Sequence, residues 1–279
     1  MKQKKISPVR IVFYLVLILI LIYQIYPVIW MIITSFKSPE DVQNRSPFSL
    51  PKPIFLENYI NAFAKSDLLS YFRNSIIVTV ITMACVILFS AFAGFAIEKL
   101  RFKGNGIVLG YFLAGITIPI HITLIPLFII YKNVGILSTW VSLILPQIGF
   151  CLPISIYLFT AFFKYIPNGM FEAAIIDGAN VPRTFFKIYF PLSKNTIMTV
   201  ATVNFISVWN EFIFANTFIL DQSKKTIPVG LKDFVGFYGK VDWGATFAAV
   251  SMTLLPLLIV YFIFNKSIIE GMVAGAVKE

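Results

Sequence analysis

The sequence predicts an all-α integral membrane protein that crosses the bilayer several times. Hydrophobic residues make up 58% of its 279 residues and charged residues only 13%, which is too little charge to cover a soluble protein of this length. Several apolar runs approach or exceed the length of about 18–20 residues that crosses a bilayer. Basic residues gather at the ends of these runs, a pattern typical of membrane topology.

Six apolar runs are expected to form transmembrane helices. Each has roughly 20–26 residues, enough at about 1.5 Å per residue to span the bilayer with some tilt. Prolines inside the third, fourth and sixth runs allow kinks. The predicted spans are residues 11–33, 72–97, 107–131, 137–162, 196–220 and 245–265.

The first run is interpreted as a retained helix, because its apolar part exceeds the 7–15 residues of a signal peptide and no A-x-A site follows. An even number of spans places both termini on one side. The acid-free tail with Lys2, Lys4, Lys5 and Arg10 indicates that this side is cytoplasmic. Residues 34–71 and 221–244 then lie outside. The longest cytoplasmic connection is 163–195.

The formal charge of +10 could indicate nucleic-acid binding, but the basic residues flank apolar runs. Topology and anionic lipid headgroups explain them better. Cys85 and Cys151 both fall inside apolar runs, where small buried residues are expected rather than a disulfide or a metal site. His121 has no second potential ligand near it in sequence, so no metal site is expected.

A polar segment, EAAIIDGANVPRTFFKIYFP, interrupts the apolar sequence at residues 172–191. Pro167-Asn168 is a helix-start signal, with Asn168 able to cap free backbone amides. A helix of about three turns should follow and end near Gly178. Its small residues would allow it to dock into a groove on a partner protein. Alternatively, it lies on the membrane surface with Phe185, Phe186 and Ile188 in lipid.

This segment resembles the EAA loop of bacterial ABC-importer permeases, whose pattern is EAA, then Gly, then Ile-x-Leu-Pro. Phe190 stands where Leu is usual, which is an apolar replacement. The matching residues are Glu172, Ala173, Ala174, Gly178, Ile188 and Pro191.

Nearly the whole chain is similar to MalG-like permease subunits of bacterial carbohydrate ABC importers. The resemblance implies a MetI-like ABC type-1 transmembrane core in residues 72–265, an N-terminal helix with an external loop in 1–71, and a cytoplasmic tail in 266–279. The matching stretches, in order, are LENYINAF, YFRNSIIVT, SAFAGFAIEKLRFKG, IPLFIIYKNVGI, SLILPQIGFCLP, VWNEFIFA, KKTIPVGL and EGMVAGAVKE.

The resemblance further implies that the EAA segment is a cytoplasmic coupling helix seated in a cleft of an ATPase subunit. Glu172 would be its anchoring charge, Ala173, Ala174 and Gly178 would permit close approach, and Asp177 would belong to the same contact. The implied partners are a MalF-like second permease forming a heterodimer, two ABC ATPase subunits, an extracytoplasmic sugar-binding protein and membrane lipid. The tail residues implied to contact the ATPases are Gly275, Ala276, Val277 and Lys278.

Four polar residues are candidates for a sugar path, because their oxygens can accept hydrogen bonds from sugar hydroxyls. They are Gln147, Asn204, Asn210 and Glu211. The alternative is that Trp209 lies at headgroup level and Glu211 extends outward. The external loop 221–244 is expected either to contact the binding protein or to be a plain solvated loop.

No GxxxxGK[ST] motif occurs, so the chain has no phosphate-binding loop of its own. The resemblance implies that ATP and magnesium are used by the partner ATPases and that this chain binds no cofactor and is not an enzyme. HExxH and GxSxG motifs also do not occur. An ion-coupled secondary transporter is the alternative function, although Glu211 is the only acid inside a predicted span.

Overall fold

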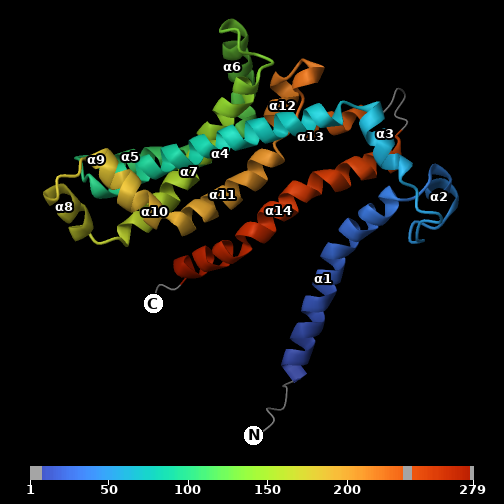
Figure 1. Cartoon of the computed structure of the whole chain (residues 1–279), viewed down its shortest axis with the longest axis horizontal. Coiled ribbons are helices and arrows are strands. Elements are labelled where there is room, and N and C mark those ends of the chain that lie inside the picture. The colour runs from blue at the N-terminus through green and yellow to red at the C-terminus, as the bar shows by residue number, and fades with distance from the viewer. Residues whose placement is uncertain (1–7, 235–240, 277–279) are drawn as a thin grey trace. The chain divides into compact units, whose positions relative to one another are not determined.

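The computed structural model describes residues 8–234 and 241–276, and the regular structure of these residues is helical (Figure 1). The chain divides into two compact units, Met1–Leu68 with Leu231–Leu255 and Leu69–Gly230 with Pro256–Glu279. In chain order the elements are α1 Pro8–Ser35, α2 Pro39–Asn44, α3 Glu57–Lys65, α4 Leu68–Lys99, α5 Asn105–Ala114, η1 Gly115–Thr117, α6 Ile120–Asn133, α7 Trp140–Lys164, α8 Gly169–Ile176, α9 Val181–Thr184, η2 Phe185–Tyr189, α10 Phe190–Leu192, α11 Lys194–Trp209, α12 Ile213–Phe218, η3 Gln222–Lys224, α13 Ile227–Gly230, η4 Leu231–Phe234 and α14 Trp243–Ala276.

Four helices in the described part of the chain are long and apolar enough to cross a membrane, and a bent pair of helices could supply a fifth crossing. The four correspond to the first, second, fourth and sixth runs predicted from hydropathy. Their membrane-spanning parts are Val9–Ser35, Leu68–Lys99, Trp140–Lys164 and Trp243–Ile263.

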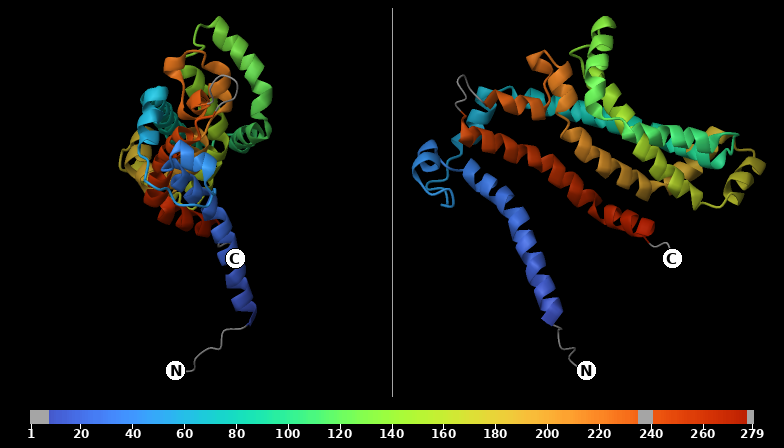
Figure 2. Two further views of the ribbon diagram at one scale, coloured as in Figure 1. Left: turned by 90° about the vertical axis from the view of Figure 1, so that its right-hand side faces the viewer. Right: turned by 180° about the vertical axis from the view of Figure 1, so that it is seen from behind.

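The third predicted span is not one straight helix. It consists of α5 with η1 and then α6, which are bent by 96° relative to each other and run in clearly different directions in Figure 2. The break falls at Ile118 and Pro119, where Ile118 is extended. Proline lacks an N–H and disfavours a helical conformation in the residue before it. Pro126, by contrast, stays inside α6.

The fifth predicted span is also interrupted. Helix α11 ends at Trp209, and the short helix α12 begins only at Ile213. The Glu211 carboxylate accepts hydrogen bonds from the backbone N–H groups of Phe214 at 2.7 Å and Ala215 at 3.1 Å. A side chain that satisfies free amides in this way starts a new helix. Hydropathy does not detect this break, because the segment stays largely apolar.

In the second unit, α4 and α7 cross closely at Gly94. A Cβ atom on Gly94 would lie 2.7 Å from Phe159 Cβ and 2.9 Å from the backbone nitrogen of Thr160. Toward the ends of these helices, an aromatic cluster forms where Phe95 meets Phe163, Phe185 and Tyr189. All four side chains are almost completely buried. Figure 1 shows α8 and α9 beside this end of α4 and α7, and α6 and α12 beside the opposite end of α7.

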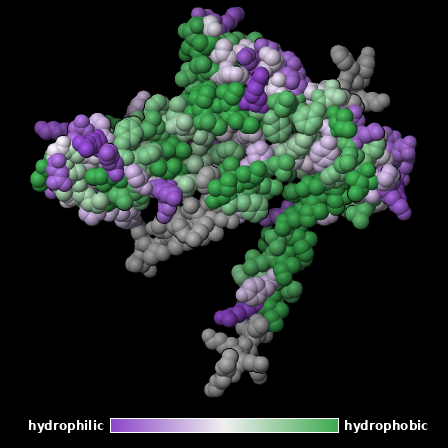
Figure 3. All heavy atoms as spheres, in the orientation of Figure 1, coloured by the Kyte–Doolittle hydropathy of each residue, from purple (hydrophilic) through white to green (hydrophobic). Residues whose placement is uncertain are grey.

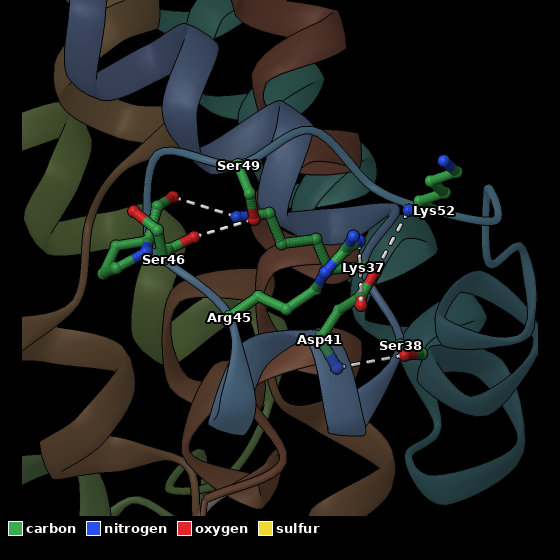
Figure 4. A network of polar contacts seen from close by, with 8 residues as sticks. Lys37, Ser38, Asp41, Arg45, Ser46, Ser49 and Lys52 are labelled. Carbon is green, nitrogen blue, oxygen red and sulfur yellow. Dashed lines mark hydrogen bonds and ion pairs between the residues drawn. The ribbon is translucent and has the colours of Figure 1, made fainter.

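In the first unit, α1 exposes apolar side chains along most of its length, and its surface is hydrophobic in Figure 3. Such a surface suits a lipid environment. Trp30 near its end meets Phe247 of α14 edge to face at 5.3 Å. The segment that follows is held by polar contacts (Figure 4), in which Asp41 accepts from Lys52 N at 3.0 Å and pairs with Arg45 at 3.3 Å.

Candidate functional site

The polar segment forms α8, a helix of eight residues and therefore shorter than the three turns expected. Gly178 ends it in the left-handed conformation, with φ of +81°. The amide of Gly178 donates to Ile175 O at 3.0 Å, and that of Ala179 donates to Ala174 O at 2.9 Å. This pair of bonds is the Schellman arrangement. Gly178 is thus required by backbone conformation, and no atom lies within 4 Å of a Cβ added there.

The start of α8 differs from the sequence prediction. Asn168 precedes the helix, but its side chain makes no capping hydrogen bond. Instead, its Oδ1 accepts a hydrogen bond from Lys99 at the end of α4. The backbone carbonyl of Asn168 accepts from the amides of Phe171 and Glu172 and so begins the helix.

Helix α8 has a face toward its own chain and a face away from it. On the inner face, Phe171 contacts the rings of Phe95 at 6.0 Å and Tyr189 at 6.5 Å, and Ala174 is only 7% exposed. Ala174 was expected to permit close approach of a partner protein. In the structure, its small side chain instead packs within this chain.

The outer face of α8 carries a mixture of charged, small and apolar residues that are all exposed: Glu172, Ala173, Ile176 and Asp177. Ile176 is 84% exposed. Hydrophilic residues gather on the surface over α8 and α9 (Figure 3). An exposed isoleucine between two carboxylates on a short helix is a surface suited to contact with another protein.

The connection from α8 to α11 packs partly into the protein core. Asn180 caps α9 by accepting from Arg183 N at 2.9 Å. Phe185 is fully buried and stacks on Phe92 at 4.2 Å, so the alternative that placed its ring in lipid is wrong for this residue. Burial also raises the pKa of the Tyr189 phenol. Phe186 remains exposed.

Two of the four candidates for a sugar path come together. Gln147 of α7 and Glu211 line a narrow cavity in the second unit, with room for about one water molecule. Ser75, Thr79 and Thr226 also line it. Among the described residues, Gln147 Oε1 and Thr226 Oγ1 are buried without a hydrogen-bond partner. Such oxygens can accept hydrogen bonds from water or from a hydroxyl group.

The other two candidates lie elsewhere. Asn204 is buried and donates to Ser155 Oγ at 2.9 Å and to Val200 O at 2.8 Å, so it joins α11 to α7. Asn210 is exposed and donates to Ile206 O of its own helix at 2.9 Å. Neither lines the cavity that Gln147 and Glu211 share.

The predicted contact residues at the C-terminus are only partly described. Gly275 and Ala276 lie in α14, whereas Val277 and Lys278 lie outside the described residues. In the loop predicted to be external, Ser223 donates from its N–H and its hydroxyl to the Asp221 carboxylate, and these bonds lower the pKa of Asp221. Residues 235–240 of this loop also lie outside the described part.

Sequence reasoning missed Lys99 as part of this site. The only signal for it in the sequence is its place within the matched stretch SAFAGFAIEKLRFKG. In residues 8–234 and 241–276, no three His, Cys, Asp or Glu side chains lie close enough together to hold a metal ion.

Helices long and apolar enough to cross a membrane place the chain among integral membrane proteins. Residues 86–272 match the family described as "Binding-protein-dependent transport system inner membrane component". The chain belongs to this family. Its members work with a binding protein and with ATPase subunits in ABC importers.

Individual relatives are similar over almost the full length. The chain is 35% identical to the diacetylchitobiose uptake system permease protein NgcG of Streptomyces coelicolor, over 94% of this chain and 85% of that protein. It is 33% identical to the trehalose/maltose transport system permease protein MalG of Thermococcus litoralis, over 96% and 97% of the two chains. These relatives give no support to the alternative of an ion-coupled transporter.

The fold is also found in a crystal structure of a bacterial ABC transporter involved in alginate import. The TM-score is 0.80 with 24% identity, over 95% of this chain and 99% of that chain. This match confirms the predicted MetI-like all-α membrane fold.

Proposed function

We propose that this chain is the sugar-translocating permease subunit of an ABC importer and that α8 is its coupling helix to the ATPase subunits. The observation that carries the proposal is the outer face of α8. It exposes Glu172, Ala173, Ile176 and Asp177, while Phe171 holds the helix to the membrane bundle. A helix that packs against its own chain on one side and is exposed on the other can transmit movement of a bound partner protein to the membrane helices.

Carbohydrate is the proposed substrate class. Relatives at 33–35% identity are named for diacetylchitobiose and for trehalose and maltose. The polar cavity at Gln147 and Glu211 offers oxygens to sugar hydroxyls, so it is the proposed contribution of this chain to the translocation path. A MalF-like second permease would complete that path as a heterodimer. ATP and magnesium would be used by the ATPase subunits, with no catalytic role for this chain.

The proposed topology puts both termini in the cytoplasm of a bacterial cell, on the same side as α8. The loop 221–244 then faces the extracytoplasmic binding protein. The C-terminal residues 275–278 are proposed to reach the ATPases as well. The basic N-terminal tail supports this orientation.

Cysteine crosslinking tests the coupling assignment. In a variant with Cys85 and Cys151 replaced, Ala173→Cys should crosslink to the ATPase subunit in the assembled complex. Lys103→Cys, which is exposed in the loop before α5, is the matched control and should react much less. Glu172→Lys should abolish transport while the protein remains in the membrane. Normal transport by Glu172→Lys, together with no crosslink at Ala173, would refute the coupling assignment.

Uptake measurements test the substrate class. Cells that carry the complete transporter should accumulate at least one radiolabelled sugar from a panel of trehalose, maltose and diacetylchitobiose. Gln147→Met preserves the side-chain length but removes the buried oxygen. We expect it to raise the KM for uptake with little change in protein level. An unchanged KM would remove Gln147 from the sugar path.

A further inference from the structure

Lys99, the last residue of α4, is buried although it carries a charge. Its side chain is 6% exposed. The Nζ atom donates to Ile166 O at 2.6 Å and to Asn168 Oδ1 at 3.1 Å. Both acceptors lie in the short link between the end of α7 and the start of α8. A single side chain from α4 thus holds the chain just before the proposed coupling helix.

The partners of Lys99 are all neutral. No described carboxylate lies within 4.0 Å of Nζ, since the ion pair found in the described part of the chain joins Arg45 to Asp41. The ring of Tyr189 lies 6.0 Å from Nζ, which adds a weak cation–π attraction. Glu98 attracts the ammonium group from beyond salt-bridge distance and Arg101 repels it. Burying an ammonium group without a close counter-charge is costly. Packing alone would be served better by an apolar residue, so the hydrogen bonds are the feature that distinguishes lysine here.

Lys99 acts together with Phe95, one helical turn earlier on the same face of α4. Phe95 contacts the ring of Phe171, on the inner face of α8, at 6.0 Å. Lys99 binds Asn168, whose carbonyl begins α8. The first turn of α8 is therefore attached to α4 at two points, one apolar and one polar.

These two attachments have different mechanical properties. The hydrophobic part of the aromatic contact is non-directional and depends on the buried area, so the rings can shift a little while they stay in contact. Hydrogen bonds weaken steeply when distance or angle changes, so the Lys99 contacts fix the position of α8 along α4. Without them α8 would still pack on the bundle, but it could shift before α4 moved.

We propose that Lys99 is a positioning residue that links displacement of α8 to movement of α4. The inference rests on the proposed function of α8 as coupling helix. Lys99 does not line the cavity shared by Gln147 and Glu211. Its role is to prevent slippage between the ATPase-driven helix and the transmembrane helix that it drives.

The test uses the complete transporter, with its partner permease, ATPases and binding protein, in proteoliposomes. The readout is the amount of sugar transported per ATP hydrolysed, with the sugar from the panel above that cells accumulate. Lys99→Met keeps the alkyl chain and removes both donors. It should lower transport per ATP by at least about fivefold, the lower end of typical coupling effects, without changing the KM for sugar. Lys99→Arg retains donors and should recover most of the coupling.

Lys164→Met is the matched control. Lys164 is the last residue of α7 and is exposed, so its removal should leave transport per ATP unchanged. If Lys99→Met fails to assemble, Asn168→Ala replaces it, since this change removes one acceptor and leaves Lys99 in place. A fall in transport per ATP in Asn168→Ala then supports the proposal, and an unchanged value overturns it.

The outcomes separate this inference from the proposed function. Unchanged transport per ATP in Lys99→Met, combined with loss of transport in Glu172→Lys, overturns the positioning role and leaves the coupling helix intact. Normal transport in both variants overturns the assignment of α8 itself. Loss of coupling in Lys99→Met with no recovery in Lys99→Arg also overturns the positioning role, because hydrogen bonding would then not be the cause.

Discussion

Asn74, near the start of α4, binds the backbone of Lys225, which lies 151 residues further along the chain. Its side-chain amide donates to Lys225 O at 2.9 Å and to Ser223 O at 2.8 Å. The neighbouring Ser75 accepts from the amide of Ile227 at 2.9 Å. Two of the stretches that matched the family, YFRNSIIVT and KKTIPVGL, are thus joined by hydrogen bonds, through which α4 holds the loop that begins at residue 221.

Replacing Asn74 by Ala should release this loop. The carbonyls of Ser223 and Lys225 would lose a buried donor, at a cost of about 1–3 kcal/mol of stability. We expect faster trypsin cleavage after Lys224 or Lys225 in detergent-solubilised protein, measured by mass spectrometry. Asn195→Ala, at an exposed position of α11, should leave the cleavage rate unchanged. Equal rates in all three proteins would show that Asn74 does not hold the loop.

Replacing Gly178 by Ala should strain the end of α8. The φ of +81° is disfavoured for residues with a Cβ, by about 1–2 kcal/mol, while space around the site is open. We expect weaker coupling of ATP hydrolysis to transport. Gly178→Asn should be milder, because asparagine tolerates this conformation better. Gly169→Ala, also with open space but without positive φ, is the control. If Gly178→Ala transports as well as Gly169→Ala, the strain has no functional effect.

Replacing Gly94 by Ala should disturb the crossing of α4 and α7. The new Cβ would lie 2.9 Å from the backbone nitrogen of Thr160, and backbone cannot move aside as a flexible side chain can. Overpacking of this kind costs about 1–3 kcal/mol, which should appear as a lower melting temperature in detergent. Gly149→Ala in α7, where nothing lies within 4 Å of the added atom, should melt like the unmodified protein. A normal melting temperature for Gly94→Ala would indicate that the helices separate easily.

Replacing Glu211 by Ala should destabilise the broken fifth span. Both carboxylate oxygens accept amide hydrogens at the start of α12, and losing a cap of this kind costs about 0.5–2 kcal/mol. Glu211→Gln retains one acceptor oxygen, so its stability should lie between that of the unmodified protein and that of Glu211→Ala. The melting temperatures of the three purified proteins, measured by thermal unfolding, test this order of stability. A role limited to sugar binding would instead leave all three equally stable and would alter only uptake.

The sequence by itself determined that this is a helical membrane protein with an EAA-type segment. Long apolar runs give that result because a bilayer requires their length and composition, whatever they pack against. Gly178 could likewise be read as the end of α8, because a local backbone requirement selects glycine there. Four of the six predicted spans correspond to long helices for the same reason.

Only the tertiary structure decided where the predicted spans break, which face of α8 points inward and which distant residues contact each other. The 96° bend at Pro119 could not be predicted because Pro126 remains within a helix, so proline alone does not determine a break. Ala174 faces inward because Phe171, on the same side of α8, packs against the rings of Phe95 and Tyr189. Phe95 lies far from Phe171 in the sequence. The hydrogen bond between Lys99 and Asn168 likewise joins residues that are far apart in the sequence. Hydropathy records how well a residue tolerates lipid, whereas contacts between distant segments depend on how the helices pack together.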